Sequence, residues 1–174
     1  MSGLFIVIEG GEASGKTTVG KILFDSLYFA GKNGILTREP GGVEESEEIR
    51  SLILKDRDQP LSGLTESYLF AASRAAHLEK VVLPVLSEGG LVVMDRYFYS
   101  SLAYQGVARG IGFDKVYEIN KQIISQRPVD VAFYLDVPLS VRLERLRKRD
   151  PALSNRMDKE SPSFMGMVDV GYKM

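Results

Sequence analysis

Hydrophobic residues along the chain fall into short unbroken runs, separated by longer stretches in which they recur every three or four positions. The four unbroken runs, rich in Val, Ile and Leu, occupy residues 4–8, 34–38, 91–95 and 130–136. Such runs are typical of strands buried under helices on both faces of a sheet. The intervening stretches predict helices over residues 16–30, 44–55, 64–87, 100–109, 113–126, 138–149 and 163–173. This alternation indicates an α/β fold with a parallel sheet flanked by helices on both faces.

A glycine-rich sequence joins the first predicted strand to the first predicted helix. Residues 10–17 read GGEASGKT and match the phosphate-binding loop pattern G-x-x-x-x-G-K-[ST]. Glycines let successive amides turn toward one anion, Lys16 is placed to reach the β- and γ-phosphates, and the Thr17 hydroxyl is placed to ligate Mg²⁺. A glycine-rich turn could fit the pattern by chance, but the flanking strand and helix favour nucleotide binding. The predicted nucleotide-binding residues are Gly10, Gly11, Glu12, Ala13, Ser14, Gly15, Lys16, Thr17 and Thr18.

Composition narrows the function classes. The 174 residues are 44% hydrophobic and 26% charged, which suits one domain over residues 1–174 with a sizeable core. The formal net charge of −1 argues against a general nucleic-acid or membrane-surface binder, because both draw on a large positive excess. The chain has no cysteine, which excludes a disulfide framework and a thiolate metal site. It enters its first strand at once and has no apolar run near the ~20 residues that span a bilayer, so we expect a cytoplasmic protein.

Charged residues follow three of the predicted strands. Glu9 follows the first, Arg38 and Glu39 the second, and Asp95 and Arg96 the third. Ligands bind beyond the carboxyl ends of the strands in open α/β sheets, so we expect these residues to converge on one cleft. There, Asp95 is placed to orient Mg²⁺ and Arg96 to bridge negatively charged oxygens.

The turn after the second strand, residues 38–42, reads REPGG. It sets an arginine and a carboxylate beside the phosphate loop. We hypothesise a cis Glu39–Pro40 bond, because cis proline is retained in tight turns. An ordinary strand-to-helix turn explains the segment equally well.

Residues 66–77 form a predicted helix on which Phe70 and Arg74, four positions apart, share a face. The ring is suited to stacking on a base, and the guanidinium to base-edge acceptors or phosphate. From spacing alone, a core aromatic and a solvated arginine are the simpler interpretation. His77, the only histidine, is expected on the helix surface rather than in catalysis. Three polar side chains spaced i, i+3 and i+4 at the opening of a later helix suit sugar and base edges: Ser101, Tyr104 and Gln105.

Residues 142–149 contain five basic side chains, of which Arg142, Arg145 and Arg149 fall on one helical face. A run of charge is usually a solvated helix face. In phosphoryl transfer, however, arginines that close over the transferred group stabilise its spreading charge. Arg156, just after the run, is the best candidate for that role, and we expect an arginine-rich lid at about residues 142–160.

Together these motifs resemble the thymidylate kinase family, specifically its bacterial type, within the P-loop nucleoside monophosphate kinases. The resemblance covers residues 6–18 (IVIEGGEASGKTT), 37–43 (TREPGGV), 69–77 (LFAASRAAH), 95–110 (DRYFYSSLAYQGVARG) and 130–138. It implies a P-loop kinase fold and transfer of the γ-phosphoryl group of ATP to dTMP with Mg²⁺, giving dTDP and ADP in dTTP synthesis. It also implies a homodimer, with ATP and dTMP as the small-molecule partners.

The resemblance further implies a role for each matching residue. Phe70 would stack on thymine, Arg74 would bond the base, and Tyr104 would crowd a 2′-hydroxyl and so favour deoxyribose. Glu12 would lie near the sugar 3′-hydroxyl. The other implied acceptor-site residues are Glu39, Pro40, Arg50, Arg96, Ser101 and Gln105, with Arg50 and Arg96 on the acceptor phosphate. The implied catalytic residues are Lys16, Arg96, Arg156 and Asp95, and the implied metal ligands are Thr17 and Asp95.

The chain stops at Met174, inside its last predicted helix. Because the family normally continues with another strand and a closing helix, we expect those elements to be missing and one sheet edge to be unpaired. Two alternatives to a thymidylate kinase stay open: a related P-loop kinase for another nucleotide or nucleoside, and a nucleotide-binding module without turnover. A switch GTPase is disfavoured, because no Asn-Lys-x-Asp motif follows the third strand.

Overall fold

The structure, a computed structural model, describes residues 3–174. Its strands are β1 (Leu4–Glu9), β2 (Gly34–Arg38), β3 (Leu91–Asp95) and β4 (Val131–Tyr134). Its α-helices are α1 (Lys16–Phe29), α2 (Glu44–Leu54), α3 (Gly63–His77), α4 (Leu83–Ser87), α5 (Phe98–Ser101), α6 (Phe113–Ile124), α7 (Leu139–Arg147) and α8 (Pro162–Lys173). Two π-helical segments, η1 (Leu78–Val82) and η2 (Leu102–Ala108), and two 3₁₀ helices, η3 (Pro151–Leu153) and η4 (Arg156–Lys159), complete the chain order.

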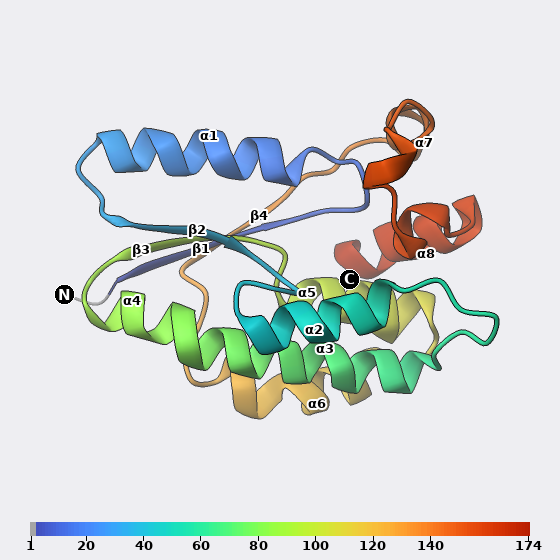
Figure 1. The fold of residues 1–174 in the computed structure, drawn as a ribbon, viewed down its shortest axis with the longest axis horizontal. Coiled ribbons are helices and arrows are strands. Elements are labelled where there is room, and N and C mark those ends of the chain that lie inside the picture. The colour runs from blue at the N-terminus through green and yellow to red at the C-terminus, as the bar shows by residue number, and fades with distance from the viewer. Residues whose placement is uncertain (1–2) are drawn as a thin grey trace.

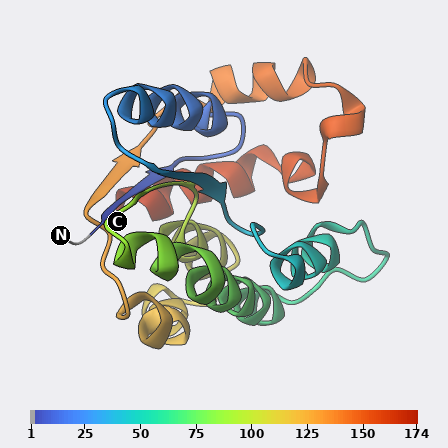
Figure 2. The same ribbon diagram turned by 60° about the vertical axis from the view of Figure 1, so that its left-hand side comes forward.

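The four strands form one parallel sheet in the order β2-β3-β1-β4, which confirms the predicted α/β architecture. Helix α1 covers one face, and α3, α4 and α6 cover the other (Figures 1 and 2). Side chains of the central strands β1 and β3 alternate between two apolar clusters. Phe5 and Val92 pack with Leu78 on one face, whereas Ile8 packs near Phe24 on the other. The continuous apolar runs in these two strands therefore reflect burial on both sides.

The edge strands are less covered. Within residues 3–174, β4 pairs with β1 alone, and its Val131 and Phe133 side chains are 38% and 45% exposed. In this part of the chain, β4 thus forms one unpaired edge of the sheet, and β2, which pairs with β3 alone, forms the other. None of the helices described in this part of the chain is long and apolar enough to cross a membrane.

Two predicted helices differ from expectation in the same way, because each contains a π-helical segment. The helix predicted over residues 64–87 is interrupted by η1, next to Pro84, which has no N–H to donate to the preceding turn. The helix predicted from residue 100 begins at Phe98 and widens into η2, where the N–H of Arg109 donates to the carbonyl of Tyr104 over 2.8 Å. Segments of this kind often occur at functional sites. Here η2 carries Tyr104 and Gln105.

Candidate active site

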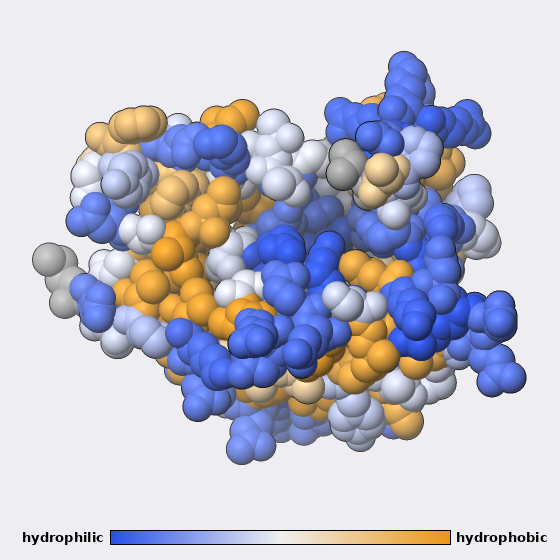
Figure 3. Space-filling view, viewed as in Figure 1, coloured by the Kyte–Doolittle hydropathy of each residue, from blue (hydrophilic) through white to orange (hydrophobic). Residues whose placement is uncertain are grey.

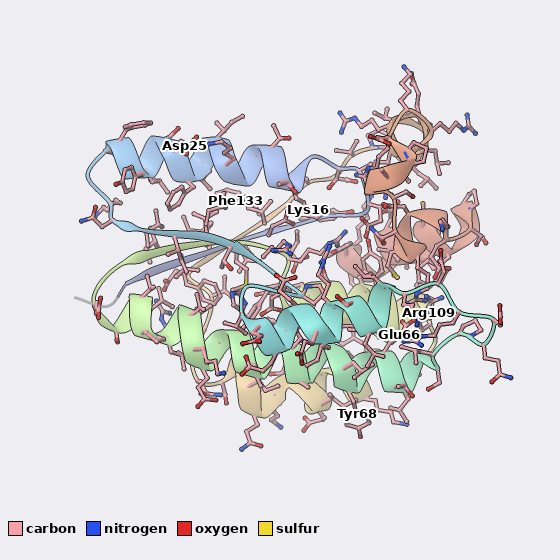
Figure 4. All side chains as sticks on the ribbon, in the orientation of Figure 1. Lys16, Asp25, Glu66, Tyr68, Arg109 and Phe133 are labelled. Atoms are coloured by element: carbon pink, nitrogen blue, oxygen red, sulfur yellow. The ribbon has the colours of Figure 1, made fainter. Side chains whose placement is uncertain are left out.

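The phosphate loop connects β1 to α1 as the sequence predicted. Gly15, the residue before α1, has a φ of +98°, a left-handed conformation that glycine adopts without strain. Lys16 opens the helix (Figure 4), and its Nζ donates to the carbonyl oxygen of Gly11 over 2.8 Å. Burial, together with the nearby charge of Arg96, lowers the pKa of Lys16 to about 8. Folding thus holds a dehydrated cation inside the loop, where an anion would be its natural partner.

The ends of the parallel strands meet at this loop. Loop residues 12–18 line a cavity together with the residues at the ends of β2 and β3: Arg38, Glu39, Asp95 and Arg96. Hydrophilic side chains gather in the hollow between the start of α1 and α2 (Figure 3). The predicted convergence on one cleft is therefore confirmed for these four residues.

Glu9 lies behind the cleft rather than in it. Its buried carboxylate accepts hydrogen bonds from the Tyr97 amide (2.7 Å), from Ser100 Oγ (2.6 Å) and from Tyr172 Oη on α8 (3.0 Å). Burial raises the pKa of Glu9, against these donors and the charge of Arg96. Glu9 thus ties the end of β1 to α5 and to the last helix.

Arg96 occupies the centre of the cleft. Its φ of +69° is a left-handed conformation that is uncommon outside glycine. The guanidinium donates to Glu12 Oε1 over 2.7 Å and to Gly10 O over 3.0 Å, and it stacks 5.2 Å from the Tyr104 ring centre. Burial alone would raise the pKa of Glu12, but the charges of Arg96 and Lys16 outweigh it and lower that pKa to about 2. The cleft therefore holds a fixed pair of opposite charges.

A second cavity adjoins the first and encloses about 590 Å³, including its open mouth. Its wall contains the predicted acceptor residues Phe70, Arg74, Ser101, Tyr104 and Gln105, together with Pro40. Five residues border both cavities: Glu12, Glu39, Arg50, Arg96 and Asn155. The structure thus brings all ten predicted acceptor-site residues to one pocket that is continuous with the phosphate loop.

Arg74 is buried, whereas its spacing alone favoured a solvated side chain. It donates to Glu39 Oε2 through Nε (2.8 Å), to Ser101 Oγ through Nη2 (3.2 Å) and to Asn120 Oδ1 through Nη1. Asn120, on α6, is a residue that the sequence reasoning missed. Its position four residues after the buried Val116, on the apolar face of the helix, was the available signal.

The expectation of a surface position for His77 is wrong, because its side chain is fully buried. Its Nε2 lies 2.8 Å from Thr37 Oγ1, and its Nδ1 lies 3.6 Å from Glu39 Oε1. The turn that holds Glu39 has the hypothesised cis Glu39–Pro40 bond. His77 therefore supports this turn from beneath.

The arginines of the predicted lid lie in three different environments. Arg142 is buried and pairs with Asp169 of α8, so a solvated face is the wrong interpretation for it. Arg145 reaches the phosphate loop and donates to Ala13 O (3.1 Å) and Ser14 O (3.3 Å), and Arg149 lines the same cavity. Arg156 instead pairs with the buried Glu66 at 2.8 Å, away from the phosphate loop. The structure thus brings Arg145 and Arg149, rather than Arg156, to the site.

Thr17 and Asp95 bring two side-chain oxygens together beside the phosphate loop. Thr17 Oγ1 donates to Asp95 Oδ2 over 2.6 Å at the edge of the phosphate cavity. In the described part of the chain, no group of three or more His, Asp or Glu side chains is arranged to hold a metal. Mg²⁺ beside phosphates typically uses only one or two protein oxygens and completes its shell with phosphate and water, so these two oxygens fit it.

Comparison with known proteins identifies the family. The family model described as Thymidylate kinase matches residues 8–173. Curated thymidylate kinases of Shouchella clausii and Oceanobacillus iheyensis are 46% and 43% identical over 98% and 99% of this chain, which spans 80% and 77% of their lengths. A crystal structure of thymidylate kinase from Ehrlichia chaffeensis superposes with a TM-score of 0.72 at 34% identity, covering 85% of this chain and 84% of that one. With its phosphate loop opening into an adjoining pocket on a parallel sheet, the chain belongs to the thymidylate kinase family.

Proposed function

We propose that the protein transfers the γ-phosphoryl group of ATP to dTMP, giving dTDP and ADP. The observation that carries this proposal is the adjacency of the two cavities, which share five lining residues: Glu12, Glu39, Arg50, Arg96 and Asn155. Phosphoryl transfer requires donor and acceptor oxygens in line and in contact, which two separate pockets would not allow. Family membership supports ATP as the donor.

On the donor side, the loop amides and Lys16 would hold the β- and γ-phosphates. We propose that Thr17 and Asp95 hold Mg²⁺, which would neutralise charge on the phosphate oxygens. Lys16 is buried and its donors contact only loop atoms, so binding of a phosphate would replace the contact with Gly11 O by a charged one.

On the acceptor side, Phe70 would stack on the base and Arg74 would bond it. Arg50 and Arg96 line both cavities and would hold the acceptor phosphate at the donor. The Tyr104 hydroxyl lies 3.1 Å from Glu12 Oε1, and together they form a wall suited to a sugar without a 2′-hydroxyl. These positions agree with the requirement for a deoxynucleoside monophosphate.

We further propose that residues 142–160 act as a lid on a single domain. Arg145 and Arg149 already face the phosphate cavity, and they are the arginines that we assign to the transferred phosphoryl group. Arg156 would reach that group only by leaving Glu66. This assignment replaces the choice of Arg156 made from the sequence.

The test is a coupled assay of ADP release with ATP, Mg²⁺ and each deoxynucleoside monophosphate in turn. We expect activity mainly with dTMP, and weaker activity with dUMP, because one methyl group contributes only ~1–3 kcal/mol of discrimination. Lys16→Ala should abolish turnover, whereas Lys21→Ala, at an exposed position of the same helix, should leave it unchanged. Nucleotide binding without turnover for every acceptor would contradict the proposal.

A further inference from the structure

Glu66, in the first turn of α3, is a fully buried carboxylate that the proposed reaction does not use. Three side chains from distant segments converge on it. Arg156 donates to Oε1 over 2.8 Å, and both Arg109 Nε and Gln105 Nε2 donate to Oε2 over 3.2 Å. Figure 4 shows Glu66 and Arg109 next to each other at the end of the helical layer. Burying a carboxylate costs free energy that its partners must offset. The contacts of Glu66 with each partner therefore indicate what the carboxylate does.

The contact with Gln105 determines how the side-chain amide of that residue is turned. A carboxylate accepts hydrogen bonds and has none to donate, so the NH₂ group of Gln105 must face Glu66. The amide is planar, and its carbonyl oxygen therefore points away from Glu66. Gln105 is 1% exposed and lines the acceptor cavity, and within residues 3–174 no hydrogen bond reaches its Oε1. That oxygen is a hydrogen-bond acceptor whose orientation is fixed, and it can accept from an N–H group of a ligand.

We propose that Glu66 is a positioning residue that selects the acceptor base by fixing the amide of Gln105. Thymine and uracil carry a hydrogen on N3 and can donate to such an oxygen. Cytosine has an unprotonated N3 and would leave two acceptors facing each other. The inference rests on the proposed function, and it adds to it the reason why an imide base is required.

The two arginines keep Glu66 in place for this role. Arg156 also donates to Ile53 O over 3.2 Å, and Arg109 also pairs with Glu160, so both guanidinium groups are anchored on their far sides. A glutamine at position 66 would keep the shape of the side chain but offer an NH₂ group as well as an oxygen. Gln105 would then be free to turn either way, and the discrimination between N3–H and bare N3 would fall.

The experiment compares dTMP with dCMP as acceptors for the whole chain and its Glu66→Gln variant. We expect the ratio of kcat/KM for dTMP over dCMP to fall at least about 10-fold, with the KM for ATP unchanged. Glu160→Gln is the matched control, because Glu160 also pairs with Arg109 but does not contact Gln105. Glu160→Gln should lower the stability of the fold without changing the ratio of kcat/KM for dTMP over dCMP. An equal loss for both acceptors in Glu66→Gln would mean a purely structural role and would overturn the proposal.

Two additions keep the test decisive. If Glu66→Gln does not fold, Gln105→Met removes the amide while leaving Glu66 paired with its arginines, and it should lower the ratio by the same factor; an unchanged ratio would overturn the inference. If the wild-type chain does not phosphorylate dTMP, the proposed function fails on its own. Calorimetric dissociation constants for dTMP and dCMP then replace kcat/KM, and the same change in their ratio on Glu66→Gln is required.

Discussion

The hydroxyl of Thr17 lies 2.6 Å from Oδ2 of Asp95, although 78 positions separate the two residues in sequence. The contact joins the first turn of α1 to the end of β3, on the central part of the sheet. Both atoms are oxygen ligands of the kind that Mg²⁺ prefers, and both face the cavity of the phosphate loop. A metal ion bound here would therefore contact two rigid elements rather than a loop.

Asp95→Asn should raise the Mg²⁺ concentration for half-maximal activity about 10-fold or more, because it removes one negative charge from the metal position. The KM for dTMP should change little. The measurement is a magnesium titration at saturating ATP and dTMP. Asp136→Asn, an exposed carboxylate after β4, should behave like the wild type. An unchanged magnesium requirement in Asp95→Asn would remove the proposed metal role.

ATP binding at pH 8 should take up about half a proton. The pKa of Lys16 is lowered to about 8 in the free protein, and a bound polyphosphate would raise it again, so the deprotonated fraction must gain protons. Affinity should therefore decline as the pH rises above 8. Calorimetric binding enthalpies in two buffers of different ionisation enthalpy give the proton count. Lys16→Arg stays charged and should take up none; the same uptake in that variant would assign the proton elsewhere.

Asn120→Leu should raise the KM for dTMP about 10-fold, because a buried guanidinium donor of Arg74 loses its partner. The KM for ATP should stay constant, since Asn120 lies behind the acceptor pocket alone. Steady-state kinetics with each substrate varied in turn would show this difference. Lys115→Met, at an exposed position of α6, is the control. Equal increases in both KM values would indicate a general loss of structure instead.

Gly42→Ala should destabilise the fold by about 3 kcal/mol or more, and Gly31→Ala by only about 1 kcal/mol. Both glycines have left-handed φ values, +91° and +86°. A Cβ on Gly42 would lie 2.5 Å from Nε2 of the buried His77, whereas a Cβ on Gly31 would meet nothing within 4 Å. Urea denaturation measures the difference. Similar losses in the two variants would show that His77 moves aside readily.

The features that the sequence predicted correctly are those set by local pattern or by topology. The phosphate loop is one continuous segment, and Asp95 reaches it because parallel strands end at the same edge of a sheet. The errors concern side chains whose surroundings come from distant segments. Arg142 is buried and pairs with Asp169, and Arg74 is buried and pairs with Glu39. Helical spacing places such a residue on a face but does not say which charge, if any, will cover that face.

The hydrogen bond from Tyr172 to Glu9 joins positions 163 residues apart. Closing a loop of such a length costs conformational entropy, which other contacts must offset before this one is stable. During synthesis, the N-terminal strand and its loop leave the ribosome first, yet their carboxylate lacks this donor until Tyr172 has emerged. The hydrogen-bonded support of Glu9 behind the cleft is therefore completed only after α8 has been translated.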